Sequence, residues 1–412
     1  MCSTSDITPS LLERDGVRLL FQKIKQASRA LALVDDEQRN LLLEHLADAI
    51  LANQDLLLEA NKLDLEKMDS QDPLYDRLQL TPERLQGIAS DMCHVASLPS
   101  PLGIITKERT LENGLYLRRV SVPFGVIGVI YEARPNVSFD VFSLCFKSGN
   151  ACILKGSKNA HHSNEAIVDL IHQTLLAEDL PTDVVALMPP THEATAELLG
   201  AVGYVDLCIP RGGKKLIEFV RDNARVPVIE TGAGVVHAYF DKDGDLEKGR
   251  AIINNAKTRR VSVCNALDCL LVHKDRVGDL PALLAFMNDN VSIHKPKEGE
   301  AFDWDREWMS YDLSIRIVDS LDEALEHIQA HGSGHSECII TENEQTAQRF
   351  QREVDAACVY VNAPTSFTDG AQFGLGAEIG ISTQKLGPRG PMALEEMTTY
   401  KWLINGNGQT RK

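Results

Sequence analysis

The sequence predicts an α/β protein with more than one domain, and three observations support this fold class. Between residues 151 and 229, short apolar runs alternate with amphipathic segments, which is typical of βαβ units and a mostly parallel sheet. The same alternation returns between residues 266 and 361. With 412 residues, the chain is long enough for two to three domains that each bury a core. We therefore expect two successive α/β domains.

The first α/β domain is expected to follow a helix-rich segment, residues 17–69, in which apolar residues recur at helical spacing. Strands are predicted at 115–117 and 126–130, where the apolar period changes. The alternating region then predicts strands at 151–154, 184–188, 205–209 and 226–229, with helices between them at 164–178, 192–199 and 214–221.

The second α/β domain is expected from about residue 237. Its apolar runs predict strands at 266–272, 314–318, 338–340 and 358–361. Ser320-Leu-Asp-Glu323 and Thr341-Glu-Asn-Glu344 have the form of capping boxes, so we expect a helix to open at each. The tail, residues 398–404, is β-prone.

Composition excludes several classes of protein. The apolar fraction is 43% and the charged fraction 25%, which are ordinary values for a globular protein. A formal net charge of −17 lacks the basic footprint of a nucleic-acid binder. No leader-like N-terminus and no run of about 18 apolar residues is visible. We expect a cytoplasmic protein that binds neither nucleic acid nor membranes.

Cysteine is the first candidate for chemistry. Nine cysteines are scattered without a Cys-x-x-Cys pair, which argues against a zinc ribbon and fits a reducing compartment with mostly buried thiols. Cys264 differs because Lys257, Arg259 and Arg260 precede it by a few residues. Cations lower the pKa of a thiol and favour the nucleophilic thiolate. The alternative is one more buried cysteine.

Two segments suit a phosphorylated cofactor. Gly212 and Gly213 lie between a predicted strand and helix, where glycines let the backbone approach a phosphate; a plain tight turn is the alternative. Lys155, Ser157 and Lys158 follow another strand and suit a ribose or a 2′-phosphate; solvated loop lysines are the alternative.

Two further patterns allow a functional and a structural interpretation. Glu230 ends a predicted strand before a glycine-rich turn, where it suits a general base or orders the turn. His327, His331 and His335 have metal-like i, i+4, i+8 spacing. Because Gly332 and Gly334 should end that helix, we expect no metal site here, and a structural or substrate-loop role for the histidines.

Four motifs together resemble the gamma-glutamyl phosphate reductase family of the aldehyde dehydrogenase superfamily. They are Val318–Ile339 (VDSLDEALEHIQAHGSGHSECI), Asn254–Thr258 before Cys264-Asn-Ala, Tyr131–Asn136 (YEARPN) and Thr398–Trp402 (TTYKW). The resemblance implies an aldehyde dehydrogenase-like fold, with two Rossmann-like α/β domains and a small β oligomerisation arm. It implies a nucleotide-binding domain of residues 1–106 and 127–236, a catalytic domain of 237–393, and an arm of 107–126 and 394–412.

The resemblance also implies roles for individual residues. Cys264 would be the nucleophile and Asn136 the side-chain amide of the oxyanion hole. The cofactor would be NADPH, bound by Lys155, Ser157 and Lys158, by Gly212 and Gly213, and by Glu307 at the nicotinamide ribose. Glu230 falls where oxidative relatives carry a hydrolytic base, but Glu-Thr-Gly-Ala-Gly replaces their Glu-Leu-Gly-Gly-Lys.

The implied reaction is NADPH-dependent reduction of L-glutamyl 5-phosphate to L-glutamate 5-semialdehyde through a cysteine thioester. Candidates for the substrate's anionic groups and pocket are Arg134, Arg259, His335, Lys385 and Arg389; surface ion pairs are the alternative for the cations. We expect a stand-alone homo-oligomer, a dimer or tetramer, with glutamate 5-kinase as a channelling partner. The rivals are an oxidative aldehyde dehydrogenase and a non-catalytic protein that reuses the fold.

Overall fold

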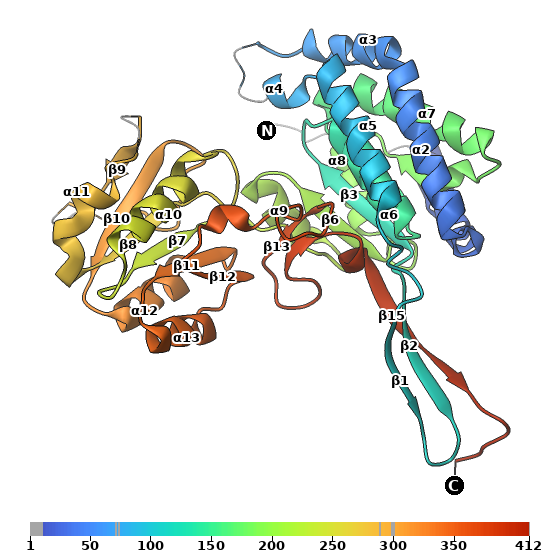
Figure 1. Cartoon of the computed structure of the whole chain (residues 1–412). Coiled ribbons are helices and arrows are strands. Elements are labelled where there is room, and N and C mark those ends of the chain that lie inside the picture. Colours follow the sequence, from blue (N-terminus) through green and yellow to red (C-terminus); the bar gives the residue numbers. More distant parts are fainter. Residues whose placement is uncertain (1–10, 71, 73–74, 288–289, 298–300, 412) are drawn as a thin grey trace, which may run out of the picture. The chain divides into compact units, whose positions relative to one another are not determined.

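The computed structural model describes residues 11–70, 72, 75–287, 290–297 and 301–411. The chain divides into two compact units, which Figure 1 shows in sequence colours. Unit 1 comprises residues 1–229 and 393–412, and unit 2 comprises residues 230–392. No helix in the described part is both long enough and apolar enough to span a membrane. The functional domain boundaries given above stay predictions.

Unit 1 begins with the expected helices. They are α1 (Leu11–Ala30), α2 (Asp36–Ala52), α3 (Gln54–Leu65), α4 (Tyr75–Leu78) and α5 (Pro82–Ser97). Helix α2 opens on a capping box, in which Asp35 accepts from the N–H of Gln38 (2.9 Å) and Gln38 accepts from the N–H of Asp35 (3.2 Å). Helix α2 buries Leu43, Leu46 and Ile50, so the apolar spacing reflects core packing.

A parallel sheet in the order β5-β4-β3-β6 forms the centre of unit 1. Its strands are β3 (Val126–Tyr131), β4 (Ala151–Lys155), β5 (Val185–Leu187) and β6 (Leu207–Arg211), and its connecting helices are α6 (Asn136–Lys147), α7 (His161–Ala177), α8 (His192–Leu199) and α9 (Lys214–Asn223). Every residue of β3 and β4 is buried, which explains their continuous apolar runs. The predicted strand at 226–229 is wrong as a strand, because it contributes only a bridge between Cys208 and Val228.

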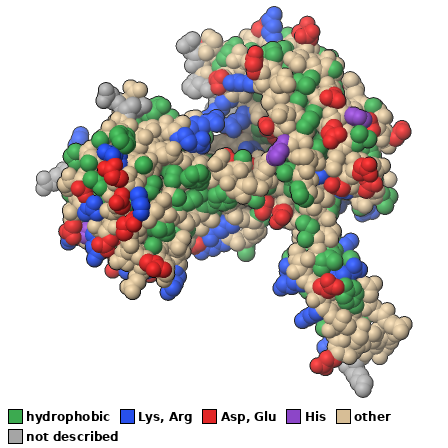
Figure 2. Space-filling model, viewed as in Figure 1, with side chains coloured by type: hydrophobic (Ala, Val, Ile, Leu, Met, Phe, Trp, Pro, Cys, Tyr) green, Lys and Arg blue, Asp and Glu red, His purple; other side chains and the backbone are tan. Residues whose placement is uncertain are grey.

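A separate antiparallel sheet forms an arm of unit 1, visible in Figure 1 as an extended ribbon. It consists of β1 (Ile105–Thr110), β2 (Tyr116–Pro123) and β15 (Thr398–Asn405), with β2 in the middle. All six residues of β1 are exposed, and Figure 2 shows basic and hydrophobic side chains together on this arm. Strand β15 lies in the tail that the sequence predicted to be β-prone, and β2 contains most of the strand predicted at 115–117, whereas β1 was not predicted as a strand.

Unit 2 contains a parallel sheet in the order β12-β11-β7-β8-β10-β9. The strands are β7 (His237–Phe240), β8 (Cys269–His273), β9 (Ser292–His294), β10 (Asp312–Val318), β11 (Ser336–Ile340) and β12 (Cys358–Val361). Its helices are α10 (Leu246–Thr258), α11 (Leu280–Leu283), α12 (Leu321–His331) and α13 (Glu344–Glu353). Two buried apolar clusters, which contain Leu270 and Leu271 on alternate sides of β8, give the sheet a core on both faces.

Smaller elements complete the chain. An antiparallel pair, β13 (Gly380–Ser382) and β14 (Gly390–Met392), belongs to unit 2 and was not predicted. Short 3₁₀ turns are η1 (Leu31–Leu33), η2 (Lys158–Ala160), η3 (Thr182–Val184), η4 (Lys274–Asp279), η5 (Thr365–Phe367) and η6 (Glu395–Met397).

One of the two predicted helix caps is confirmed. Ser320 accepts from the N–H of Glu323 and caps α12, although the Glu323 carboxylate accepts from Asp319 instead of closing the box. Thr341 is not a cap. Asn343 takes that position and accepts from the N–H groups of Gln345 and Thr346, so α13 starts later than predicted.

Candidate active site

Cys264 lies in the loop between α10 and β8 of unit 2 and is partly exposed. The backbone of Gly234 packs directly against it: a Cβ added at Gly234 would stand 1.7 Å from the Cys264 carbonyl oxygen and 3.1 Å from its Cα. Only glycine fits this approach. The glycine-rich turn after Glu230 therefore forms one wall of the thiol loop.

A carboxylate fixes the other side of that glycine. Oε1 of Glu307 accepts a hydrogen bond of 2.9 Å from the N–H of Gly234. Glu307 thus positions the segment that packs on Cys264, a contact that sequence spacing does not reveal. Its predicted place at the nicotinamide ribose stays a prediction.

Two threonines anchor the residue that follows the thiol. The Asn265 side-chain amide donates to the Thr368 carbonyl (2.8 Å), and the Thr365 hydroxyl donates to the Asn265 carbonyl (2.8 Å). Both threonines are fully buried. Buried hydrogen bonds of this kind hold a loop in one conformation. Sequence reasoning missed both residues, because they are distant in the chain and have no motif of their own.

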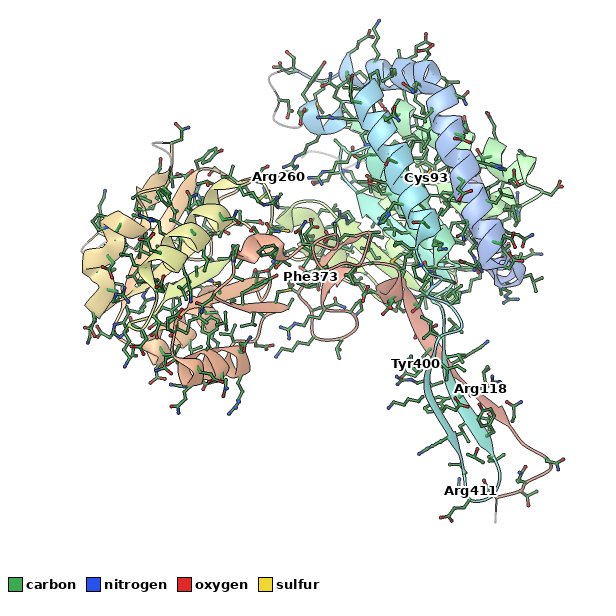
Figure 3. The ribbon with its side chains drawn as sticks, viewed as in Figure 1. Cys93, Arg118, Arg260, Phe373, Tyr400 and Arg411 are labelled. Carbon is green, nitrogen blue, oxygen red and sulfur yellow. The ribbon has the colours of Figure 1, made fainter. Side chains whose placement is uncertain are left out.

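The cations upstream of Cys264 have different surroundings. Lys257 is fully buried on α10 and donates to the Leu267 carbonyl (2.9 Å), so it braces the end of the thiol loop; burial lowers the pKa of its ammonium. Arg259 and Arg260 follow the helix and are exposed, and Figure 3 labels Arg260 there. Beyond the loop, burial raises the pKa of Asp268 to about 7, although Asp268 accepts from the N–H groups of Val236 and Trp308.

The predicted cofactor segment lies at the carboxyl end of β4 in unit 1. Lys155 is the last residue of that strand, and its Nζ donates to the Gly156 carbonyl at 3.3 Å, while burial lowers the pKa of the ammonium. The Ser157 hydroxyl is buried without a hydrogen-bond partner among the described residues. Lys158 is exposed. An orphaned hydroxyl between two lysines fits a phosphorylated ribose, which would supply the missing partner.

The predicted phosphate loop already holds an anion. Gly213 is the N-cap of α9, and its N–H donates to Oε2 of Glu132 (3.0 Å). A Cβ at Gly212 would come within 2.8 Å of the Glu132 carboxyl carbon. The two glycines therefore make room for the Glu132 carboxylate at a helix N-terminus, a favourable position for negative charge. Their contact with a pyrophosphate stays a prediction.

Asn136 is the first residue of α6, and its amide has a defined partner. Nδ2 donates to Oδ2 of Asp140, one helical turn later, at 3.0 Å. Burial raises the pKa of Asp140 to about 6, so at neutral pH the carboxylate accepts from Asn136 and orients its amide.

The candidate substrate residues have different surroundings within their own units. Lys385 and Arg389 both pair with Asp355, Arg389 at 2.7 Å, as in the ion-pair alternative considered for them. Arg134 and Arg259 are exposed, Arg134 in unit 1 and Arg259 in unit 2. His335 is fully buried, and its Nδ1 lies 2.8 Å from the Ser336 hydroxyl. Their substrate contacts stay predictions.

The three histidines of the i, i+4, i+8 row have different hydrogen-bond partners, although the rings of His327 and His331 lie 4.7 Å apart. His331 pairs with Asp305 (2.7 Å) near the surface, and His335 contacts Ser336. His327 instead faces the sheet, where its Nε2 lies 3.7 Å from the Cys269 sulfur. Burial, together with neighbouring cations, lowers the pKa of His327 to about 3, so the imidazole is neutral. Among the described residues, these three histidines do not form one group of possible metal ligands.

The chain resembles known proteins along most of its length. The sequence model of the aldehyde dehydrogenase family matches residues 8–302 and 313–403. A gamma-glutamyl phosphate reductase of Bacteroides thetaiotaomicron is 56% identical over 410 residues, which covers 95% of this chain and 98% of the relative.

Solved structures agree. A crystal structure of gamma-glutamyl phosphate reductase from Thermotoga maritima is 38% identical, with a TM-score of 0.92, and the match covers 95% of this chain and 99% of that one. An engineered glycolyl-CoA reductase with bound NADP+ shares the fold alone, at 17% identity and a TM-score of 0.67 over 94% of this chain and 96% of that one. These matches confirm the family resemblance and the fold class predicted from the sequence.

Proposed function

Because the chain belongs to the gamma-glutamyl phosphate reductases of the aldehyde dehydrogenase family, we propose that it reduces L-glutamyl 5-phosphate to L-glutamate 5-semialdehyde and phosphate. This is the second step of proline synthesis from glutamate. The single observation that carries the proposal is the full-length identity of 56% to a reductase of that name. The partly exposed Cys264 in a braced loop supports it.

Cys264 is the proposed nucleophile. Its thiolate attacks the acyl carbon of the substrate, the bond between that carbon and the phosphate oxygen breaks, and phosphate leaves. The product is a thioester on Cys264, which accepts a hydride more readily than a carboxylate does. When bound, NADPH supplies that hydride. The resulting thiohemiacetal then collapses to the aldehyde and restores the thiolate.

Hydrogen-bond donors stabilise the oxyanion that precedes this collapse. We assign this role to the Asn136 amide and the backbone N–H of Cys264. Each such donor typically lowers the activation barrier by about 2.7–4 kcal/mol. An Asn136→Ala variant should therefore lose roughly 100- to 1000-fold in kcat.

The preference for NADPH over NADH is assigned to Lys155, Ser157 and Lys158. A 2′-phosphate would accept from the buried Ser157 hydroxyl and pair with the ammonium groups. Lys158→Gln should raise the KM for NADPH several-fold and leave the KM for NADH unchanged. Equal effects on both cofactors would contradict the assignment.

Phosphate dependence distinguishes this reaction from oxidative aldehyde dehydrogenation. In the reverse direction, the reductase needs inorganic phosphate to release the acyl group, whereas a hydrolytic enzyme uses water and a general base such as Glu230. Purified protein is incubated with the semialdehyde and NADP+, with and without phosphate. We expect turnover only with phosphate, and none from Cys264→Ser.

A matched control separates catalysis from general damage to a thiol. Cys93 is exposed on α5 and is labelled in Figure 3. Cys93→Ser should keep the activity of the parent. Phosphate-independent formation of glutamate, or full activity of Cys264→Ser, would overturn the proposal.

We also propose that the arm joins subunits into a homo-oligomer. Tyr400, Trp402 and Ile404 on β15 are 56%, 42% and 59% exposed, a concentration of large apolar groups that association would bury. Figure 3 labels Tyr400 on the arm. Trp402→Asp should lower the mass measured by light scattering to that of the monomer, whereas Leu33→Asp, at an exposed leucine on η1, should not.

A further inference from the structure

A buried cluster of two imidazoles and a thiol lies in unit 2, and the reaction above uses none of them. His237 is the first residue of β7 and Cys269 the first of β8, and the parallel register pairs these two residues directly. Neighbours in register project to the same face of a sheet. His327 reaches that face from α12. The three side chains are 0%, 1% and 2% exposed.

The spacing of the donor atoms suits one shared ion. One ligand atom from each side chain lies within 4.8 Å of the other two. The Cys269 sulfur and Nε2 of His327 are 3.7 Å apart. Two donors that share a tetrahedral zinc ion, with bonds of about 2.3 Å to sulfur and 2.0 Å to nitrogen, stand roughly 3.5 Å apart.

His237 shows the second and independent sign of a ligand. Its Nε2 is buried and has no hydrogen-bond partner among the described residues. Its other nitrogen, Nδ1, lies 3.1 Å from Oε2 of Glu337, which the sheet register places beside it on β11. A histidine that donates from Nδ1 to a carboxylate presents a bare lone pair at Nε2, and this arrangement is usual behind zinc-bound histidines.

We propose that His237, Cys269 and His327 form a binding site for a thiolate-preferring d¹⁰ cation, with Zn²⁺ as the reference ion. Imidazole nitrogens and a thiolate are donors that zinc prefers, whereas magnesium and calcium prefer oxygen. We expected no metal at the row of three histidines, and the proposed site departs from that expectation because it includes His327. No other histidine of the row takes part. The proposal does not depend on the reductase reaction.

Binding of Zn²⁺ to this cluster displaces two protons. Arg316 donates to Nδ1 of His327 (2.7 Å), and since a guanidinium only donates, neutral His327 carries its proton on Nε2, facing the Cys269 sulfur. Binding of Zn²⁺ releases this proton and the thiol proton. The thiolate and the imidazolate then offset the two positive charges of the ion, and the Arg316 guanidinium stabilises the imidazolate.

A pocket lies beside the cluster. A cavity of about 270 Å³ between α12 and the start of β12 is lined in part by Ile328 and Glu337. Ile328 follows His327 in the helix, and Glu337 contacts His237. The pocket therefore lies beside the cluster, and none of the three ligands is among its lining residues.

Cobalt is the probe for this site, because a thiolate bound to Co²⁺ gives a charge-transfer band. The full chain is stripped with a chelator, and one equivalent of Co²⁺ is added, followed by Zn²⁺ as competitor. We expect a saturable band at one Co²⁺ per chain that Zn²⁺ abolishes. The band should persist in Cys264→Ser and Cys93→Ser, because neither thiol belongs to the cluster.

Variants at the cluster complete the test. Cys269→Ser should lose the charge-transfer band, and His237→Gln should weaken cobalt binding at least 10-fold. Cys338→Ser, at a buried thiol on β11 outside the cluster, should keep both. If Cys269→Ser does not fold, the parent protein still tests the proposal, because one equivalent of Zn²⁺ should raise the Tm of the parent. No band and no Tm change in the parent, or a band lost in Cys264→Ser, would overturn the proposal. Neither result would bear on phosphate-dependent turnover.

Discussion

Replacing Gly234 with alanine should move the Cys264 thiol, the proposed nucleophile, without removing any group that takes part in the proposed chemistry. The new Cβ would lie 1.7 Å from the Cys264 carbonyl oxygen, whereas ordinary contact begins at 3.4 Å. The two backbones must therefore separate by about 1.7 Å. Neither segment moves easily, because Glu307 holds the N–H of Gly234 and two threonines hold Asn265.

The expected loss follows from that displacement. Misplacing a reacting atom by about 1 Å can reduce a rate roughly 100-fold. We therefore expect Gly234→Ala to lower kcat at least about 100-fold in the phosphate-dependent assay. The alkylation rate of Cys264 by iodoacetamide should also change, since its surroundings shift. The KM for NADP+ should change less than kcat, because the proposed cofactor-binding residues other than Glu307 belong to unit 1.

Gly278→Ala is the matched control. Gly278 lies on η4 in the same unit, and a Cβ added there meets no atom within 4 Å. This variant should keep full activity. A Gly234→Ala enzyme that folds and retains more than half of the parent kcat would contradict the expected loss.

Three further changes probe the site and its support. Burial raises the pKa of Asp140 from 3.8 to about 6, so the parent loses free energy of unfolding as the pH rises through that window. Asp140→Asn does not titrate there. Its free energy of unfolding relative to the parent should therefore rise by about 1–2 kcal/mol between pH 4 and 7 in urea titrations, a value reduced for the half-buried position of Asp140. Thr365→Val removes the hydroxyl that holds Asn265, and should cost about 1–3 kcal/mol of unfolding free energy and lower kcat, while Thr106→Val on the exposed arm should do neither. Leu43→Ala, at a fully buried leucine of α2, should cost about 2–5 kcal/mol by the same titration, and a cost below 1 kcal/mol would contradict the assigned core.

The elements that the sequence revealed are those whose signal is local. Buried parallel strands such as β3 and β4 appear as continuous apolar runs, and Ser320 caps α12 through a neighbour three residues away. The predictions that were wrong concern residues whose partners are distant in the sequence. Thr341 failed as a cap because its hydroxyl donates to Asp241, on the strand end beside it in space. The strand at 226–229 failed because it has only one bridge to β6.

The site was predictable to the same extent. Cys264 and Lys155 stand next to charged or strand-end motifs that the chain shows directly. The hydrogen bonds from Gly234 to Glu307 and from Gly213 to Glu132 form only when segments 73 and 81 residues apart in the sequence come together. The row of three histidines was misleading as a pattern, since their true partners are set by sheet register and by the end of α12.

The proposed reaction requires one transient thioester on Cys264 in each chain, and a rapid-mixing experiment without phosphate detects this thioester. The semialdehyde and NADP+ are mixed with the enzyme, and NADPH absorbance is followed. We expect a burst of one NADPH per chain, followed by steady turnover only when phosphate is added, and no burst from Cys264→Ser. Phosphate-dependent turnover without any burst, or an undiminished burst from Cys264→Ser, would contradict it.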